Sequence, residues 1–137
     1  MTACAKCGFD PAAPVTARWT FELDKRVISA NLRTVNAGSS RWRYAKERDA
    51  WRWLVRMRRI EHRMPAAARK RRVTIERVYA GRCQEMDRDN LVAGTKPLVD
   101  AIAREGLLVG DKPDQLELHV VQRRGESNAT IVTIEEF

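Results

Sequence analysis

The sequence holds few of the side chains that build zinc sites, with three cysteines and two histidines in 137 residues. Cys4 and Cys7 have the spacing of half a four-ligand zinc site, but no second Cys-x-x-Cys pair follows. A zinc ion would need Cys83 together with one distant histidine, His62 or His119. We therefore expect reduced thiols and no structural zinc.

Long hydrophobic runs are also missing. No apolar stretch approaches the ~20 residues that a transmembrane helix needs, and the N-terminus lacks the apolar core of a signal peptide. We therefore expect no membrane association and a cytoplasmic location. The chain is long enough for one domain with a modest core, and its apolar content of 44% excludes a disordered basic tail.

Acidic residues are the minority charge, with 18 Asp and Glu against 26 Lys and Arg, which gives a net charge of +8. Such an excess favours a polyanionic partner, most often nucleic acid. The charge predicts only non-specific attraction, because sequence-independent phosphate contacts depend on charge alone.

Hydrophobic periodicity divides the chain into a flexible leader at 1–16 and a single domain at 17–137. Alternating apolar residues predict strands at 17–27, 73–83, 115–122 and 128–134, and helical spacing predicts helices at 41–64 and 90–105. A loop rich in Asn and Ser spans 29–40, and 123–127 is expected to be a hairpin turn. The order β-α-β-α-β-β predicts an α+β fold, a mixed four-stranded sheet covered by two helices.

Local signals set the expected helix ends. Ser39 or Ser40 can cap the first helix and Pro65 stops it. Pro97 cannot donate a helical hydrogen bond, so the second helix is expected to bend or restart near Thr95. Gly106 fits its end.

The first helix carries two lanes of side chains, and residues 66–72 continue as a basic linker. An apolar lane predicted to face the core comprises Ala50, Trp53, Leu54, Met57, Ile60 and Met64. A basic lane on roughly the opposite side, predicted to contact DNA phosphates together with the linker, comprises Arg48, Arg52, Arg56, Arg59 and Arg63, with Arg69, Lys70, Arg71 and Arg72 in the linker. Trp51 and Val55 lie between the lanes, where they could be available to a partner subunit.

Three aspartates could form one acidic cluster, which is unexpected in a chain of net charge +8. Asp87 and Asp89 follow the second predicted strand, and Asp111 follows the second predicted helix, with Lys96 as a cation near them. If the three acids converge, a divalent ion is the simplest way to neutralise them. Hard oxygen ligands suit Mg²⁺ or Mn²⁺, which can hydrolyse a phosphodiester. The alternative is structural, because Asp and Asn are common helix caps.

The whole string closely resembles the RusA family of Holliday-junction resolvases: Asp87-x-Asp89-Asn90-Leu91, Lys96-Pro97-Leu98, Asp100, Gly106-Leu107 and Asp111. The resemblance implies a small homodimeric Mg²⁺-dependent endonuclease, bacterial or phage-encoded, that cuts two opposed strands of a four-way DNA junction. It implies metal binding and catalysis by Asp87, Asp89 and Asp111, catalysis by Lys96, and supporting roles for Asn90 and Asp100.

The sequence departs from the family pattern in three places. Gly110 stands where the family has the first of two adjacent acids, and Asp114 is a possible substitute nearby. The interval between Asn90 and Lys96 is longer than in shorter members. Gln84-Glu85-Met86 replace the basic residues that often precede the first aspartate. The prediction is a junction-resolving endonuclease of DNA recombination and repair; the alternative is a non-catalytic basic nucleic-acid-binding protein.

Overall fold

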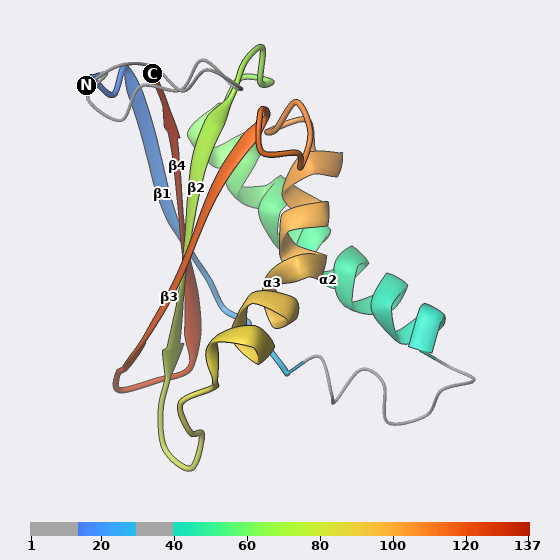
Figure 1. The fold of residues 1–137 in the computed structure, drawn as a ribbon, viewed down its shortest axis with the longest axis vertical. Coiled ribbons are helices and arrows are strands. Elements are labelled where there is room, and N and C mark those ends of the chain that lie inside the picture. The colour runs from blue at the N-terminus through green and yellow to red at the C-terminus, as the bar shows by residue number, and fades with distance from the viewer. Residues whose placement is uncertain (1–13, 30–39) are drawn as a thin grey trace.

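The computed structural model describes residues 14–29 and 40–137. Figure 1 shows its six elements in the order β-α-β-α-β-β, so the predicted α+β class is confirmed. The predicted leader, except for residues 14–16, and nearly all of the Asn/Ser loop lie outside the described residues. The elements are β1 (Ala17–Leu23), α2 (Ser40–His62), β2 (Arg71–Tyr79), α3 (Arg88–Arg104), β3 (Leu116–Arg124) and β4 (Ala129–Glu136).

The four strands form one mixed sheet in the order β1-β4-β2-β3. β2 pairs in parallel with β3, whereas β4 is antiparallel to both β1 and β2. The predicted β3–β4 hairpin is therefore wrong, because β2 lies between these strands. Their connection passes around the end of β2: Gly125 N donates to Tyr79 O at 2.9 Å, and Ala80 N donates to Asn128 Oδ1 at 2.9 Å.

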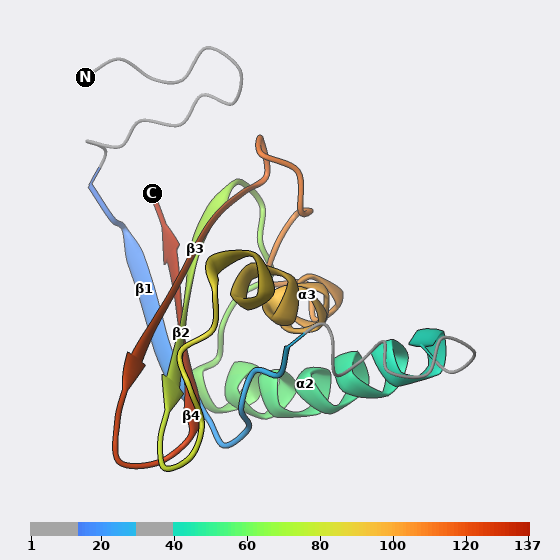
Figure 2. The ribbon, with the colours of Figure 1, turned by 60° about the horizontal axis from the view of Figure 1, so that its bottom comes forward.

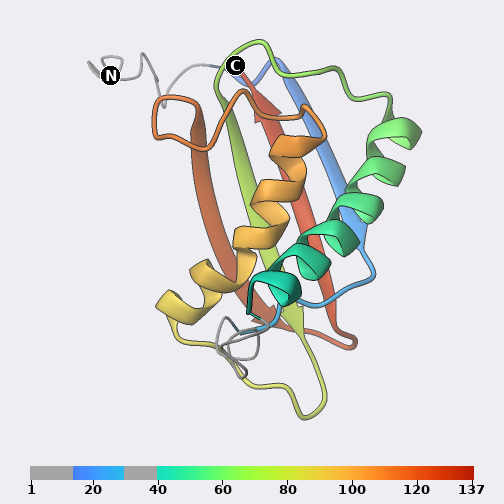
Figure 3. The same cartoon turned by 90° about the vertical axis from the view of Figure 1, so that its right-hand side faces the viewer.

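Both helices cover the same face of the sheet (Figures 2 and 3). The strands show why: in β1, Phe21 and Leu23 are buried while Thr20 and Glu22 are exposed, as the two-residue period of a half-buried strand requires. Across the described part of the chain, no helix is both long and apolar enough to cross a membrane.

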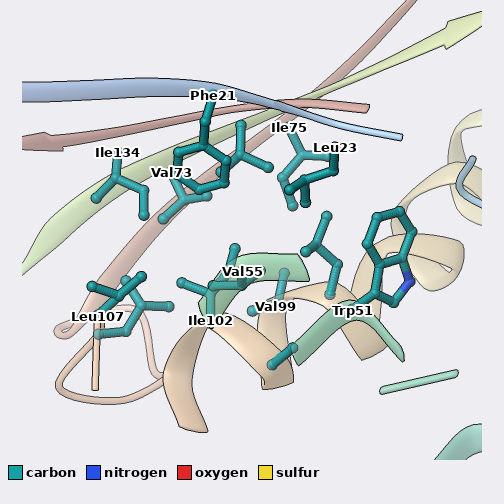
Figure 4. Packing of buried hydrophobic residues seen from close by; sticks show 14 of the residues in the cluster. Phe21, Leu23, Trp51, Val55, Val73, Ile75, Val99, Ile102, Leu107 and Ile134 are labelled. Atoms are coloured by element: carbon teal, nitrogen blue, oxygen red, sulfur yellow. The ribbon is translucent and has the colours of Figure 1, made fainter. Parts of the chain in front are cut away.

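The core fills the space between the sheet and the two helices (Figure 4). Helix α2 contributes the fully buried side chains of Trp51 and Val55 to the core, and α3 contributes those of Leu98 and Ile102. The sheet contributes Phe21, Leu23, Val73, Ile75, Leu116, Val132 and Ile134.

The predicted apolar lane of α2 is wrong at its centre. Trp53, Met57 and Ile60 are 61%, 50% and 59% exposed, whereas Trp51 and Val55 are 0% exposed. Of the other predicted members, Ala50 is exposed, Leu54 packs partly against the core, and Met64 is buried beyond the helix end. α2 therefore has apolar side chains on two sides, and the buried side is the one with fewer of them, Trp51 and Val55.

α3 is a single helix from Arg88 to Arg104 and continues through Pro97, so of the two predicted alternatives the restart at Thr95 is wrong. The other alternative, a bend, is visible in Figures 1 and 3, where the two halves of α3 run in different directions. Thr95 is buried and donates from Oγ1 to Val92 O at 2.8 Å instead of capping a new helix. Gly106, at φ 78°, follows the helix end as predicted. In α2, Arg63 adopts φ 52° after the last turn, and Pro65 lies beyond it as expected.

Candidate functional site at the N-terminus of helix α3

Asp87 is the N-cap of α3. Its backbone is extended, and its side chain accepts from Asn90 N at 3.3 Å and Asn90 Nδ2 at 2.5 Å. Asn90 therefore contacts the Asp87 carboxylate directly, which is consistent with its predicted supporting role. Asp89 lies in the first turn of α3, where the positive end of the helix dipole favours carboxylates.

Two residues apart in extended chain, the carboxylates of Asp87 and Asp89 would share one face, but here the helix begins between them, at Arg88. Both residues are nevertheless exposed at the same helix end. Asp87, but not Asp89, lines an open hollow of about 570 Å³ between the start of α3 and β3, together with Glu85, Met86, Arg88, Leu91, Val120, Val121 and Gln122.

The segment that leads into Asp87 is held by two side chains of the sheet. Gln122 on β3 accepts from Met86 N at 3.0 Å and donates to Met86 O at 2.6 Å. Arg77, its register partner on β2, donates to Gln122 Oε1 and to Gln84 O, both at 3.0 Å. Arg77 is 4% exposed, and burial lowers the pKa of its guanidinium. The sheet thus fixes the position of the first aspartate.

Exposed arginines surround the same loop, residues 80–87. Arg124 donates to Gly81 O at 3.2 Å and to Cys83 O at 3.1 Å, and Arg26 lies 3.2 Å from Cys83 Sγ. Arg82 and Arg88 are also exposed here. None of these arginines was predicted to belong to the site; only Arg82 and Arg88 adjoin the acidic motif in the sequence, whereas the fold brings Arg26 and Arg124 to the loop.

Asp111 lies elsewhere. It lines a second pocket, of about 380 Å³, between α3 and β3, together with Lys96 and Asp100. Within the described residues, no group of three His, Cys, Asp or Glu side chains could hold a metal ion. The predicted convergence of three acids is therefore absent from the single chain. The cause is the unbroken α3, which at 17 residues spans about 25 Å and separates Asp87 from the loop that carries Asp111.

The side of α3 that carries Asp89 nevertheless leads towards this second pocket. Lys96 is seven residues from Asp89, nearly two whole turns, so the two share one side of the helix about 10 Å apart along its axis. Asp100, one further turn along, accepts from Tyr44 Oη. Asp111 and Asp114 are exposed in the loop after α3.

Gly110 is the position where the resembled family has an additional acid. A side chain there would collide with the side chain of Gln115, which is flexible enough to move. The glycine therefore leaves room for the Gln115 side chain, and Asp114 is exposed in the same loop.

The basic lane of α2 differs from the predicted unpaired ridge. Three of its five members reach the carboxylate of Glu105, which is 4% exposed at the end of α3: Arg52 at 3.1 Å, Arg56 at 2.8 Å and Arg59 at 3.4 Å. Arg48 lies 3.3 Å from Asp49, and Arg63 is exposed. A buried carboxylate needs charge compensation, so these arginines join α2 to α3.

The basic linker is likewise partly structural, since β2 begins inside it. Arg71 is 1% exposed, contacts Glu136 at 2.8 Å, and donates to Leu107 O at 3.0 Å. Its hydrogen bond to Glu136 lowers the pKa of that carboxyl. Arg72 contacts Glu117 at 2.5 Å, whereas Arg69 is exposed and Lys70 is half-buried. The prediction that the linker extends to residue 72 is wrong for Arg71 and Arg72, which belong to β2.

Cys4 and Cys7, which have the spacing of half a zinc site, lie outside the described residues. Cys83 has the Arg26 guanidinium beside it, and His119 lies 3.2 Å from Glu117 at an exposed position. No family model and no curated protein matches this chain.

Proposed function

We propose that this chain is a Mg²⁺-dependent endonuclease of branched DNA, as its resemblance to the RusA resolvases implies. The observation that carries the proposal is the pair of exposed carboxylates, Asp87 and Asp89, at one helix N-terminus, with Asp87 lining an open hollow. In a chain of net charge +8, exposed arginines flank these acids.

The donor set fits the ion. Mg²⁺ is usually held by one or two carboxylates together with waters and substrate phosphate, and Asp87 and Asp89 offer such oxygens without a softer ligand. When bound, Mg²⁺ polarises a phosphoryl oxygen and lowers the pKa of the attacking water. The chain's own part is to orient: Gln122 and Arg77 fix the loop, and Asn90 fixes the Asp87 carboxylate.

A basic nucleic-acid-binding protein is the second candidate. The capping bond from Asn90 N to Asp87 favours it, because that bond gives Asp87 a structural role. Incubating the purified chain with a labelled four-way junction separates the two. Cleavage in Mg²⁺ but not in a chelator supports the nuclease, and binding without cleavage supports the alternative.

We place the phosphate contacts at the loop 80–87 and not along the α2 lane. The slope of log affinity against log salt is negative, and replacing Arg82 and Arg124 by Gln should flatten it by about 0.9 per lost phosphate contact. The matched control replaces Arg52 and Arg56 by Gln, which should lower the stability but leave the salt slope unchanged, because both arginines serve Glu105. Fluorescence anisotropy over a salt series measures the slopes. A flattened slope in the Arg52 and Arg56 variant alone would reverse the assignment.

A further inference from the structure

A third hollow, which we call the α2 hollow, opens between the N-terminal half of α2 and the segment that follows β1. Its volume of about 440 Å³ is within the range of small-ligand sites. It is lined by Lys25, Ile28, Trp42, Arg43, Lys46, Glu47 and Ala50. Three basic side chains stand against one acidic side chain in this lining, whereas each hollow beside α3 has two acids against one base. The α2 hollow therefore favours an anionic ligand.

One wall of the α2 hollow is an indole ring. Trp42, in the first turn of α2, is 64% exposed, and the Lys46 ammonium lies 5.0 Å from the centre of its ring. Lys46 is exposed as well, is not a member of the basic lane, and has no carboxylate partner among the described residues. An aromatic face beside such an ammonium is the combination that binds a nucleobase together with its phosphate.

The opposite wall of the α2 hollow is held in place by contacts within the chain. Lys25 contacts Glu47 at 3.0 Å, and its ammonium lies 5.2 Å from the centre of the Trp51 ring, so it fixes the segment after β1 against α2. Ile28 packs against α3, where a side chain at Gly94 would come within 2.5 Å of Ile28 O. Lys25 therefore belongs to the frame of the hollow and not to the groups left for a ligand. A wall that is fixed before binding lowers the ordering cost of a complex.

The α2 hollow lies at the same end of the molecule as the acidic motif. The N-terminal ends of α2 and α3 both lie towards the end of the sheet at which the loop 80–87 leaves β2 (Figures 1 and 3). A branched DNA that carries unpaired nucleotides can therefore contact both places from one side of the chain.

We propose that the α2 hollow binds one unpaired nucleotide of the DNA, with its base stacked on Trp42 and its phosphate at Lys46. The ammonium of Lys46 covers one face of the indole, so the base stacks on the other face. Stacking tolerates any base, because every base has a π-face. The hollow therefore selects unpaired over paired DNA without reading sequence. This inference rests on the proposed function only for its nucleic-acid partner, and it adds a preference for unpaired bases.

Fluorescence anisotropy of the full chain with a single-stranded oligothymidine and with a blunt duplex of equal length, both in EDTA, tests this preference without cleavage. Trp42→Ala should weaken single-strand binding about ten- to a hundredfold and leave duplex binding nearly unchanged. Trp53→Ala is the matched control, because Trp53 is 61% exposed on the same helix but does not line the hollow. It should bind both DNAs like the wild type. No single-strand binding by the wild type, equal losses in the two variants, or equal losses for the two DNAs would overturn the proposal.

Two further variants separate stacking from charge and from misfolding. Trp42→Phe keeps an aromatic face, so its affinity for the single strand should be closer to the wild type than to Trp42→Ala. Lys46→Gln should flatten the salt slope of single-strand binding by about 0.7, the value for one phosphate contact, whereas Trp42→Ala should leave the slope unchanged. A phenylalanine variant as weak as the alanine variant, or an unchanged slope in Lys46→Gln, contradicts the proposed contacts. A chain that binds the single strand through Trp42 but cleaves no DNA in Mg²⁺ supports this inference and refutes only the nuclease.

Discussion

Asp89→Asn is expected to reduce Mg²⁺-dependent cleavage of a four-way junction on the order of a thousandfold, similar to the loss of one preorganised group at a site of charge development. The amide keeps the shape of the side chain but removes the charge that would hold the ion. Binding of the junction should be unchanged or tighter, because a carboxylate that repels phosphate is gone. Single-turnover cleavage and anisotropy measure the two effects separately.

The matched control for this variant is Glu22→Gln. Glu22 is exposed on the strand β1, and neutralising it makes the same change in net charge. Cleavage by this variant should match the wild type. If Asp89→Asn also cleaves at the wild-type rate, the assignment of Asp89 to the catalytic metal site is wrong.

Trp51→Ala is expected to lower the free energy of unfolding by about 3–5 kcal/mol, because a fully buried indole is replaced by a cavity. Trp53→Ala, two residues along the same helix, should change it by only about 0.5 kcal/mol in the monomer, since Trp53 is 61% exposed. Urea denaturation at low protein concentration measures both values. Equal losses, or a larger loss at Trp53, would mean that α2 is rotated relative to the described core.

The contrast between these two tryptophans shows what helical periodicity could and could not predict. It located α2 within two residues at each end, because Pro65 and the apolar spacing are local signals. It chose the wrong side, because the exposed side of α2, with Trp53, Met57 and Ile60, contains more apolar residues than the side with Trp51 and Val55. Which side is buried depends on the sheet and on Glu105 of α3, and neither is visible in the sequence of α2.

In the sheet, too, local features were predictable from the sequence and long-range features were not. Alternation in the strands predicted their existence and order along the chain. It could not predict that β2 would insert between β3 and β4, because strand pairing is a long-range choice. The Arg123–Ser127 segment has turn composition, but its contacts are with the end of β2.

In the candidate site, the contacts between residues close in sequence were the most predictable. The capping of α3 by Asp87 and its contact with Asn90 follow from residue types at short spacing. The meeting of Asp111 with Asp87 assumed that the chain returns after the helix to its start, whereas Asp111 lines a pocket with Lys96 and Asp100 from the second half of α3. The buried pair Arg77 and Gln122 gave no sequence signal, because neighbouring strands far apart in the chain supply it.

The most direct test of the metal assignment is Mn²⁺ titration of the ¹⁵N-labelled chain followed by NMR. Mn²⁺ broadens amide signals near its site, so the account predicts that the signals of Met86 to Leu91 disappear first. The loop with Asp111 and Asp114 should follow only at higher concentration. Broadening confined to that loop, or spread evenly over all exposed acids, would contradict a divalent ion held by Asp87 and Asp89.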